Sequence, residues 1–274
     1  MNVPNNIVIY GRDNQAPNEI NCRVIADSKI GFGISVGTTS KPNEDCLGVS
    51  IFEDNVLLAI ADGHWGGDAS ELAIQKATNM FRSTDRLPRE NEIRARFYAL
   101  FEQINRELFE LAMVNPGASA PETTLIVCHL KNMLSERYLY WSSFGDSFLF
   151  ILRRDELIQL NSLHAYWLGM LSRLSENSKT RQLVLKSLFG ESRYVGVADG
   201  LETGVEKLQS GDVIVLCTDG LIGSDEKLPE SISQKIQTIL KDVAPLENKI
   251  KELIKSALDR GEEDNVACIV AHID

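Results

Sequence analysis

The sequence predicts an α+β fold in which two antiparallel β-sheets pack as a sandwich with helices on the outside. Short apolar runs typical of strands stand on both sides of two amphipathic segments that have helical spacing. Strands and helices do not alternate regularly, which argues against a parallel α/β fold. With 274 residues and a hydrophobic fraction of 43%, the chain suits one large domain or two small ones, and we expect a single domain over 1–274.

In the first half of the chain, residues 1–28 are expected to be an N-terminal extension or an edge strand. The next apolar runs predict strands at 31–37, 46–52 and 55–61 and helices at 68–81 and 93–111. A short turn separates the second and third of these strands, so a hairpin is expected there.

In the second half, the expected strands lie at 125–130, 137–143, 148–152, 213–217 and 266–273, and the expected helices at 228–240 and 246–258. Short links join the first three strands, which favours one antiparallel meander. Residues 161–210 show no clear period, although 179–189 has the composition of a helix. This segment is either a flap over a site or plain packing.

Charge and cysteine content exclude several classes of protein. The formal net charge of −11 argues against nucleic-acid binding, which requires a basic face. The five cysteines form no C-x-x-C pair and read as small core residues of an intracellular protein. No signal peptide or membrane span is visible, so a cytoplasmic protein with no membrane partner is expected.

Three carboxylates stand at predicted strand ends, each beside Gly or Asn. They are Asp62, Asp219 and Asp264. Mg²⁺ and Mn²⁺ prefer oxygen ligands, and a Gly next to an Asp leaves room for a backbone carbonyl to join them. Alone, each of these Asp-Gly or Asp-Asn dipeptides is an ordinary turn sequence. Together they predict a site for divalent cations.

Further acidic residues have a less specific pattern. Glu44 and Asp45 precede a predicted strand and can ligate a metal or orient its water, although such a pair alone is more often a solvated loop. Asp146 lies in Gly145-Asp146-Ser147, for which a hairpin turn is an equally good interpretation. His64 lies in a Gly-rich, acidic setting and is a candidate general acid. The other three histidines are assigned to structure.

A rival motif is G-x-S-x-G at Gly33–Gly37, with Ser35 as the nucleophile of a serine hydrolase. That nucleophile requires a helix directly after the turn. Residues 38–45 contain Pro42 and no helical pattern, so the match is interpreted as accidental.

These motifs, in this order, resemble the metal-dependent Ser/Thr protein phosphatases of the PPM, or type-2C, family. The resemblance spans roughly residues 31–273 and implies a four-layer α-β-β-α sandwich. The residues that carry it are Asn43-Glu44-Asp45, Asp62-Gly63-His64 with Gly66-Gly67, Thr123-Thr124-Leu125, Gly145-Asp146-Ser147, Thr218-Asp219-Gly220 and Asp264-Asn265-Val266.

The resemblance implies a role for each residue. Asp62 would bridge two Mg²⁺ or Mn²⁺ ions, the Gly63 carbonyl would join the second ion, and Asp219 and Asp264 would hold the first. Glu44 and Asp45 would bind metal-coordinated waters, and Asp146 with Asp219 would correspond to a third, weaker metal position. His64 would protonate the leaving oxygen of a phosphorylated protein substrate.

Two departures from the family pattern stand out. The family usually has a phosphate-binding Arg five residues before the Asp that corresponds to Asp45. This chain has Ser40 at that position, with Lys41 beside it. Lysine supplies a single charge, but it cannot make the two parallel hydrogen bonds that an arginine guanidinium makes to a phosphate. Weaker phosphate binding is therefore expected. Trp65 is inserted between His64 and the two glycines, where it is either an apolar wall beside the site or, as the preferred interpretation, part of the core.

Three functions follow, in order of preference. The first is a monomeric Mg²⁺- or Mn²⁺-dependent phosphoprotein phosphatase that acts in signalling. The second is a pseudophosphatase that binds phosphoproteins and turns over little. The third is the serine hydrolase.

Overall fold

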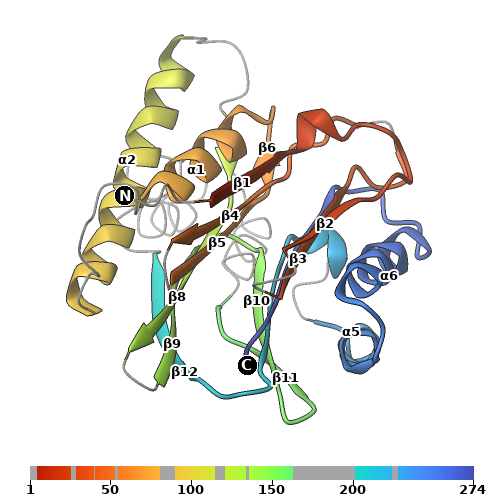
Figure 1. Cartoon of the computed structure of the whole chain (residues 1–274). Coiled ribbons are helices and arrows are strands. Elements are labelled where there is room, and N and C mark those ends of the chain that lie inside the picture. Colours follow the sequence, from red (N-terminus) through yellow and green to blue (C-terminus); the bar gives the residue numbers. More distant parts are fainter. Residues whose placement is uncertain are drawn as a thin grey trace, which may run out of the picture.

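The computed structural model describes residues 5–25, 29–39, 41–52, 55–80, 90–114, 121–133, 136–162, 201–223 and 228–274. These residues form two six-stranded sheets, a small two-stranded sheet and flanking helices (Figure 1).

The first sheet has the strand order β1-β4-β5-β8-β9-β12, and every neighbouring pair is antiparallel. Its strands are β1 (Asn5–Tyr10), β4 (Cys46–Phe52), β5 (Asn55–Ala61), β8 (Leu125–Met133), β9 (Glu136–Phe144) and β12 (Glu202–Leu208). The predicted hairpin is confirmed, since β4 and β5 pair from Cys46 opposite Ala61 to Phe52 opposite Asn55.

The second sheet has the order β11-β10-β13-β14-β3-β2 and is also antiparallel. Its strands are β2 (Asn21–Ile25), β3 (Ile30–Ser35), β10 (Phe148–Arg153), β11 (Glu156–Gln159), β13 (Val213–Cys217) and β14 (Val266–His272). The small sheet pairs β6 (Gly63–His64) with β7 (Glu122–Thr123). In the first 28 residues, β1 and β2 therefore occupy an edge of each large sheet.

Helices cover the outer faces of the sandwich (Figure 1). They are α1 (Asp68–Asn79) and α2 (Glu90–Val114) on the first sheet and α5 (Glu230–Lys241) and α6 (Leu246–Leu258) on the second, with short 3-10 turns at η1 (Gly11–Asp13) and η3 (Asp219–Leu221). The predicted α-β-β-α sandwich is confirmed. Within the described part of the chain, no helix combines the length and the apolar character needed to cross a membrane.

The core consists of three apolar layers, because strands buried on both faces send alternate side chains in opposite directions. Leu58 and Ile60 of β5 point between the sheets, where Phe32 and Ile269 of the second sheet also pack. Leu57 of β5 points outward to the layer under α1 and α2. The third layer lies between the second sheet and α5 and α6. Two rigid sheets face each other in this way, which fixes the positions of their strand ends.

The predicted meander of three consecutive strands is wrong. Strands β8 and β9 pair with each other, but β10 lies in the other sheet and pairs with β11 and β13. The link between β9 and β10 therefore crosses the sandwich, and Gly145 within it has a φ of +101°. A short polar link looks the same in the sequence whether the next strand returns beside its neighbour or crosses to the opposite sheet.

Strands β11 and β12 and the two short strands β6 and β7 had no counterpart in the sequence prediction. The predicted helix over 179–189 lies outside the described residues, as does the proposed flap except for 161–162 and 201–210.

Candidate metal site

Four acidic segments meet at one end of the sandwich because antiparallel pairing places the start of one strand beside the end of the next. Asp62 follows β5, and Asp45 precedes β4, in register with Cys46 opposite Ala61. Asp219 follows β13 and Asp264 precedes β14, in register with Cys217 opposite Cys268. Each sheet thus brings two carboxylates to this end.

A hydrogen bond connects the two sheets at this point. The Thr218 hydroxyl donates to Oδ2 of Asp45 over 2.9 Å, and both residues are completely buried. The same hydroxyl accepts the backbone N–H of Ala267 over 3.0 Å. The carboxylate from the first sheet is therefore held against the strand ends of the second.

Hydrogen bonds from a neighbouring segment hold the backbone of Asp62 in place. Its N–H donates to the Thr124 hydroxyl over 3.0 Å, and its carbonyl accepts the N–H of Thr124 and the hydroxyl of Thr123, each over 2.8 Å. The Thr124 hydroxyl also lies 2.7 Å from that of Ser147, next to Asp146. The turn that carries Asp62 is therefore connected to the crossover that carries Asp146.

The carboxylates are crowded, and Asp45 and Asp62 are buried, whereas Asp219 is partly buried and Asp264 is exposed. Burial raises the pKa of Asp62 well above its usual value, and the charges of Asp45 and Asp219 raise it further. Asp45 shows the same direction of pKa shift, again chiefly through burial. Burial and the charges of Asp146 and Asp264 raise the pKa of Asp219 to about 7, although a hydrogen bond with Asp62 opposes this. These shifts indicate burial together with a concentration of negative charge, which a bound cation would compensate.

Two carboxylate oxygens make the need for a cation specific. Oδ1 of Asp45 and Oδ1 of Asp219 are buried and have no hydrogen-bond partner. A buried polar atom without a partner is costly, and a bound ion would satisfy it. The donors are all oxygens, the type that Mg²⁺ and Mn²⁺ prefer. Across the described ranges, however, no group of three or more His, Cys, Asp or Glu side chains is placed so that it could hold a metal ion by itself. Waters would therefore complete the coordination, as is usual for Mg²⁺.

Glu44 connects three parts of the site. Its backbone N–H donates to Oδ1 of Asn265 over 2.7 Å, and its Oε1 accepts the N–H of Gly66 over 2.6 Å. The side chain is half-buried, whereas Asp45 is completely buried. The solvated-loop interpretation of this pair is therefore wrong for Asp45.

Close backbone packing explains two of the glycines. Gly37 has a φ of +87°, and a Cβ at this position would overlap the backbone carbonyl of Asp264. A Cβ on Gly63 would lie 2.6 Å from the carbonyl oxygen of Glu44. Glycine is required where the acidic segments pack against neighbouring backbone.

His64 is accessible and lies beside the buried carboxylates. Its Nδ1 is 4.0 Å from Oδ1 of Asp62, and its side chain is 55% exposed. Among the described histidines, His129 is buried in β8, where its Nε2 contacts Oδ1 of Asn55 over 2.9 Å, and burial lowers its pKa to about 3. His272 lies in β14, and His164 is outside the described residues.

Three predictions about individual residues have different outcomes. Trp65 does not pack into the core, because it is 65% exposed and has a φ of +66°. The hairpin interpretation of Asp146 is wrong, since its segment crosses between the sheets. Lys41 is exposed, and Ser40 lies outside the described residues, so the phosphate-binding role of Lys41 stays a prediction.

Ser35 does not lie on a nucleophile elbow. It ends β3, is 1% exposed, and accepts the N–H of Gly37 over 3.4 Å. No helix follows in 36–39 or 41–45. The positioning roles of Thr218 and Asn265 were missed by sequence reasoning, although both are polar residues directly beside a candidate ligand.

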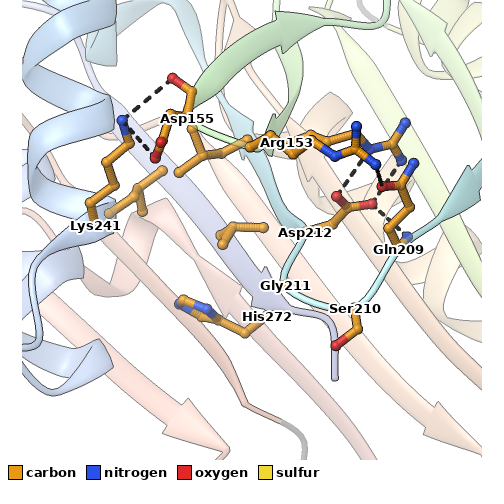
Figure 2. A pocket seen from close by; sticks show the side chains of 12 residues that line it. Arg153, Asp155, Gln209, Ser210, Gly211, Asp212, Lys241 and His272 are labelled. Atoms are coloured by element: carbon orange, nitrogen blue, oxygen red, sulfur yellow. Dashed lines mark hydrogen bonds and ion pairs between the residues drawn. The ribbon is translucent and has the colours of Figure 1, made fainter.

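A cavity of about 560 Å³ lies at the opposite end of β13 (Figure 2). Arg153 there donates to both oxygens of Asp212 over 3.0 and 2.7 Å, and Lys241 pairs with Asp155 over 3.0 Å. Since these charges are paired and far along the strand from Asp219, the cavity is separate from the carboxylate cluster.

Fold and site together define a sandwich protein that holds a cluster of buried carboxylates at one end of its sheets. No protein-family model matches the chain. The serine/threonine phosphatase Stp of Listeria monocytogenes is 27% identical over 253 residues, which cover 89% of this chain and 95% of the relative. The PstP phosphatase of Mycobacterium tuberculosis is 25% identical over 86% of this chain and 43% of its own length.

Solved structures share the fold. The Streptococcus agalactiae (S. agalactiae) serine/threonine phosphatase aligns with a TM-score of 0.70 and 22% identity over 93% of this chain and all of its own. The PPM Ser-Thr phosphatase MsPP of Mycobacterium smegmatis, in complex with cacodylate, gives a TM-score of 0.61 and 21% identity over 89% of this chain and 98% of its own. In sequence and in fold, this chain is similar to the PPM-type serine/threonine phosphatases, as the motifs predicted.

Proposed function

We propose that this chain is a metal-dependent serine/threonine phosphoprotein phosphatase that hydrolyses phosphomonoesters with water. One observation carries the proposal. Carboxylates from four separate strand ends converge in a cluster in which Asp45 and Asp62 are buried, and Asp45 and Asp219 each keep an oxygen without a partner. The names of the relatives supply the reaction class.

The residues that would hold the cations are those named from the sequence. Asp62, Asp219, Asp264 and the Gly63 carbonyl would hold two Mg²⁺ or Mn²⁺ ions, Glu44 and Asp45 would hold their waters, and Asp146 with Asp219 would hold a third ion weakly. Such ions supply a water of lowered pKa and neutralise charge on the phosphoryl oxygens.

His64 would act as the general acid. A bond forms between the water oxygen and phosphorus, and the bond from phosphorus to the seryl or threonyl oxygen breaks. His64 would give its proton to that leaving oxygen and regain one from solvent, to which the attacking water loses a proton. Its imidazole is exposed to an incoming substrate and lies 4.0 Å from the Asp62 carboxylate. The exposed Lys41 would supply a single positive charge to the phosphate in place of the family's arginine.

The substrate would be a phosphorylated protein and not a nucleic acid, in line with the net charge of −11. A cytoplasmic location is part of the proposal and is supported by the five free cysteines, which suit a reducing compartment. A monomer without a membrane partner completes it, and light scattering after gel filtration tests the oligomeric state.

The decisive experiment measures hydrolysis of p-nitrophenyl phosphate and of a phosphoserine peptide with Mn²⁺, with Mg²⁺ and with chelator. Asp62→Ala and Asp219→Ala should each lower kcat/KM by at least about 100-fold. Loss of a group that only orients a metal ligand already lowers metal affinity or activity by about 10–100-fold. Asp155→Asn, in the separate cavity and 81% exposed, is the matched control. Equal rates in wild type and both Ala variants would refute the proposal.

Calorimetric titration with Mn²⁺ separates enzyme from pseudophosphatase. Binding of at least two ions with turnover supports the enzyme. Binding of phosphopeptide with little turnover would favour the pseudophosphatase. The absence of the family's phosphate-binding arginine is the argument for this alternative.

A further inference from the structure

Trp65 combines two features that a surface residue seldom has together. Its side chain is 65% exposed, and its φ of +66° lies in the left-handed region that bulky residues rarely adopt. Single exposed apolar residues are ordinary on protein surfaces. Unfavourable backbone conformations, in contrast, concentrate at ligand-binding sites, where the surroundings enforce them.

The surroundings of Trp65 enforce its position on both sides. His64, before it, pairs with Glu122 in the β6–β7 ladder. Gly66, after it, donates its N–H to Oε1 of Glu44 over 2.6 Å. Because consecutive Cα atoms are about 3.8 Å apart, the backbone of Trp65 directly adjoins that of His64, the proposed general acid.

The space next to Trp65 is open. Gly66 has a φ of +112°, and a Cβ built on it would meet no atom within 4 Å. Most of the other exposed large apolar side chains lie elsewhere, on the outer helix α2 (Figure 1); they include Tyr98, Phe109, Leu111, Met113 and Val114. Trp65, in contrast, directly follows His64, whose ring lies 4.0 Å from the Asp62 carboxylate, and is therefore adjacent to the carboxylate end.

The charge around Trp65 indicates which ligand would suit the indole. Asp68 is exposed three residues later, and Glu44 is half-buried behind Gly66. Tryptophan binds cations over its ring better than any other side chain. An exposed indole with carboxylates close by complements a basic side chain and would repel an acidic one.

We infer that Trp65 is a specificity-determining residue that stacks against an Arg or Lys side chain flanking the phosphorylated residue of the substrate. This inference rests on the proposed phosphatase activity, and it deepens that activity by stating which peptides the site prefers. It gives the indole a ligand, and it explains why an unfavourable backbone conformation is retained on the surface.

The test uses phosphoserine peptides in which one Arg, Ala or Glu is placed in turn at each of the three positions on either side of the phosphoserine. At the best position, the wild-type protein with Mn²⁺ should prefer Arg to Ala by about five- to tenfold in kcat/KM, the range expected for a partly exposed cation–π contact. Glu at that position should be the poorest of the three.

Three variants separate the indole from the backbone. Trp65→Gly and Trp65→Asn suit a positive φ and remove the ring, whereas Trp65→Phe keeps an aromatic face. In Trp65→Gly and Trp65→Asn, the kcat/KM values for the Arg and Ala peptides should become about equal. In Trp65→Phe, part of the preference for Arg should remain. Unchanged thermal unfolding of Trp65→Gly shows that the ring is not a structural support.

The outcomes are distinguishable. If wild type has no preference for Arg, or if Trp65→Gly keeps it, the inference is wrong. A marked loss of thermal stability in Trp65→Gly would also overturn it. Failure of wild type to hydrolyse p-nitrophenyl phosphate with either metal would count against the proposed function itself.

Discussion

The Thr218 hydroxyl donates a 2.9 Å hydrogen bond to Oδ2 of Asp45, a residue 173 positions earlier in the chain. Asp45 precedes a strand of the first sheet, and Thr218 follows a strand of the second. This hydroxyl thus connects the two halves of the carboxylate cluster, and it can be removed without changing any carboxylate.

Thr218→Val should destabilise the protein. The substitution keeps the shape of the side chain but leaves the buried Asp45 oxygen and the Ala267 N–H without this partner. The expected loss is roughly 1–3 kcal/mol, measured by urea unfolding. Thr218→Ser keeps the hydroxyl and is the control, with a loss below about 1 kcal/mol. Equal losses in the two variants would mean that the methyl group, and not the hydrogen bond, matters.

Asp219→Asn should stabilise the metal-free protein at alkaline pH. The pKa of Asp219 is raised to about 7, so the folded state binds a proton that the unfolded state has already released. Stability from this group is present below the unfolded pKa and is lost as pH rises through about 7. Near pH 8 the variant should exceed wild type by roughly 2–4 kcal/mol, since one pKa unit is worth about 1.36 kcal/mol.

This difference should shrink as pH falls toward about 5, where the wild-type carboxyl is protonated in the folded state. Unfolding in the presence of chelator gives both curves, and histidines and surface acids cancel between the two proteins. Added Mn²⁺ should reverse the order, because the variant lacks a ligand. A difference that does not vary with pH would contradict the assigned charge repulsion.

Gly37→Ala should disturb metal binding from outside the ligand set. A Cβ at Gly37 would overlap the backbone carbonyl of Asp264, and the φ of +87° is itself unfavourable for alanine. Gly211→Ala is the matched control, since its φ is +89° and a Cβ there meets nothing within 4 Å. Both variants carry a similar backbone cost of about 1–2 kcal/mol.

The additional loss in Gly37→Ala therefore measures the contact with Asp264. We expect at least about tenfold weaker Mn²⁺ binding by calorimetry in Gly37→Ala, comparable to loss of a group that orients a ligand, and no change in Gly211→Ala. Equal Mn²⁺ affinity in both variants would show that Asp264 tolerates displacement.

His64→Gln should show the signature of a lost general acid. The rate with a phosphoserine peptide should fall by about 100-fold, because the seryl oxygen needs a proton as it leaves. The rate with p-nitrophenyl phosphate should fall far less, because nitrophenolate leaves without one. A uniform fall with both substrates would assign His64 to binding.

The sequence predicted the elements whose signal is local. Strands β4, β5 and β13 and helix α6 match their predicted bounds, because apolar runs and helical periods are properties of neighbouring residues. It also identified the carboxylates, since acidic residues at strand ends are visible without a structure. It missed β12, and it predicted burial for Trp65, because exposure depends on what packs against a side chain.

By itself, the sequence determined which acidic residues stand at the ends of strands and that the chain forms a sandwich of sheets. Only the tertiary structure decided that β10 crosses to the second sheet, that Thr218 joins Asp45, and that Trp65 faces solvent with a positive φ. The reason is that these features depend on contacts between segments far apart in the chain, whose partners the local pattern of residues does not specify.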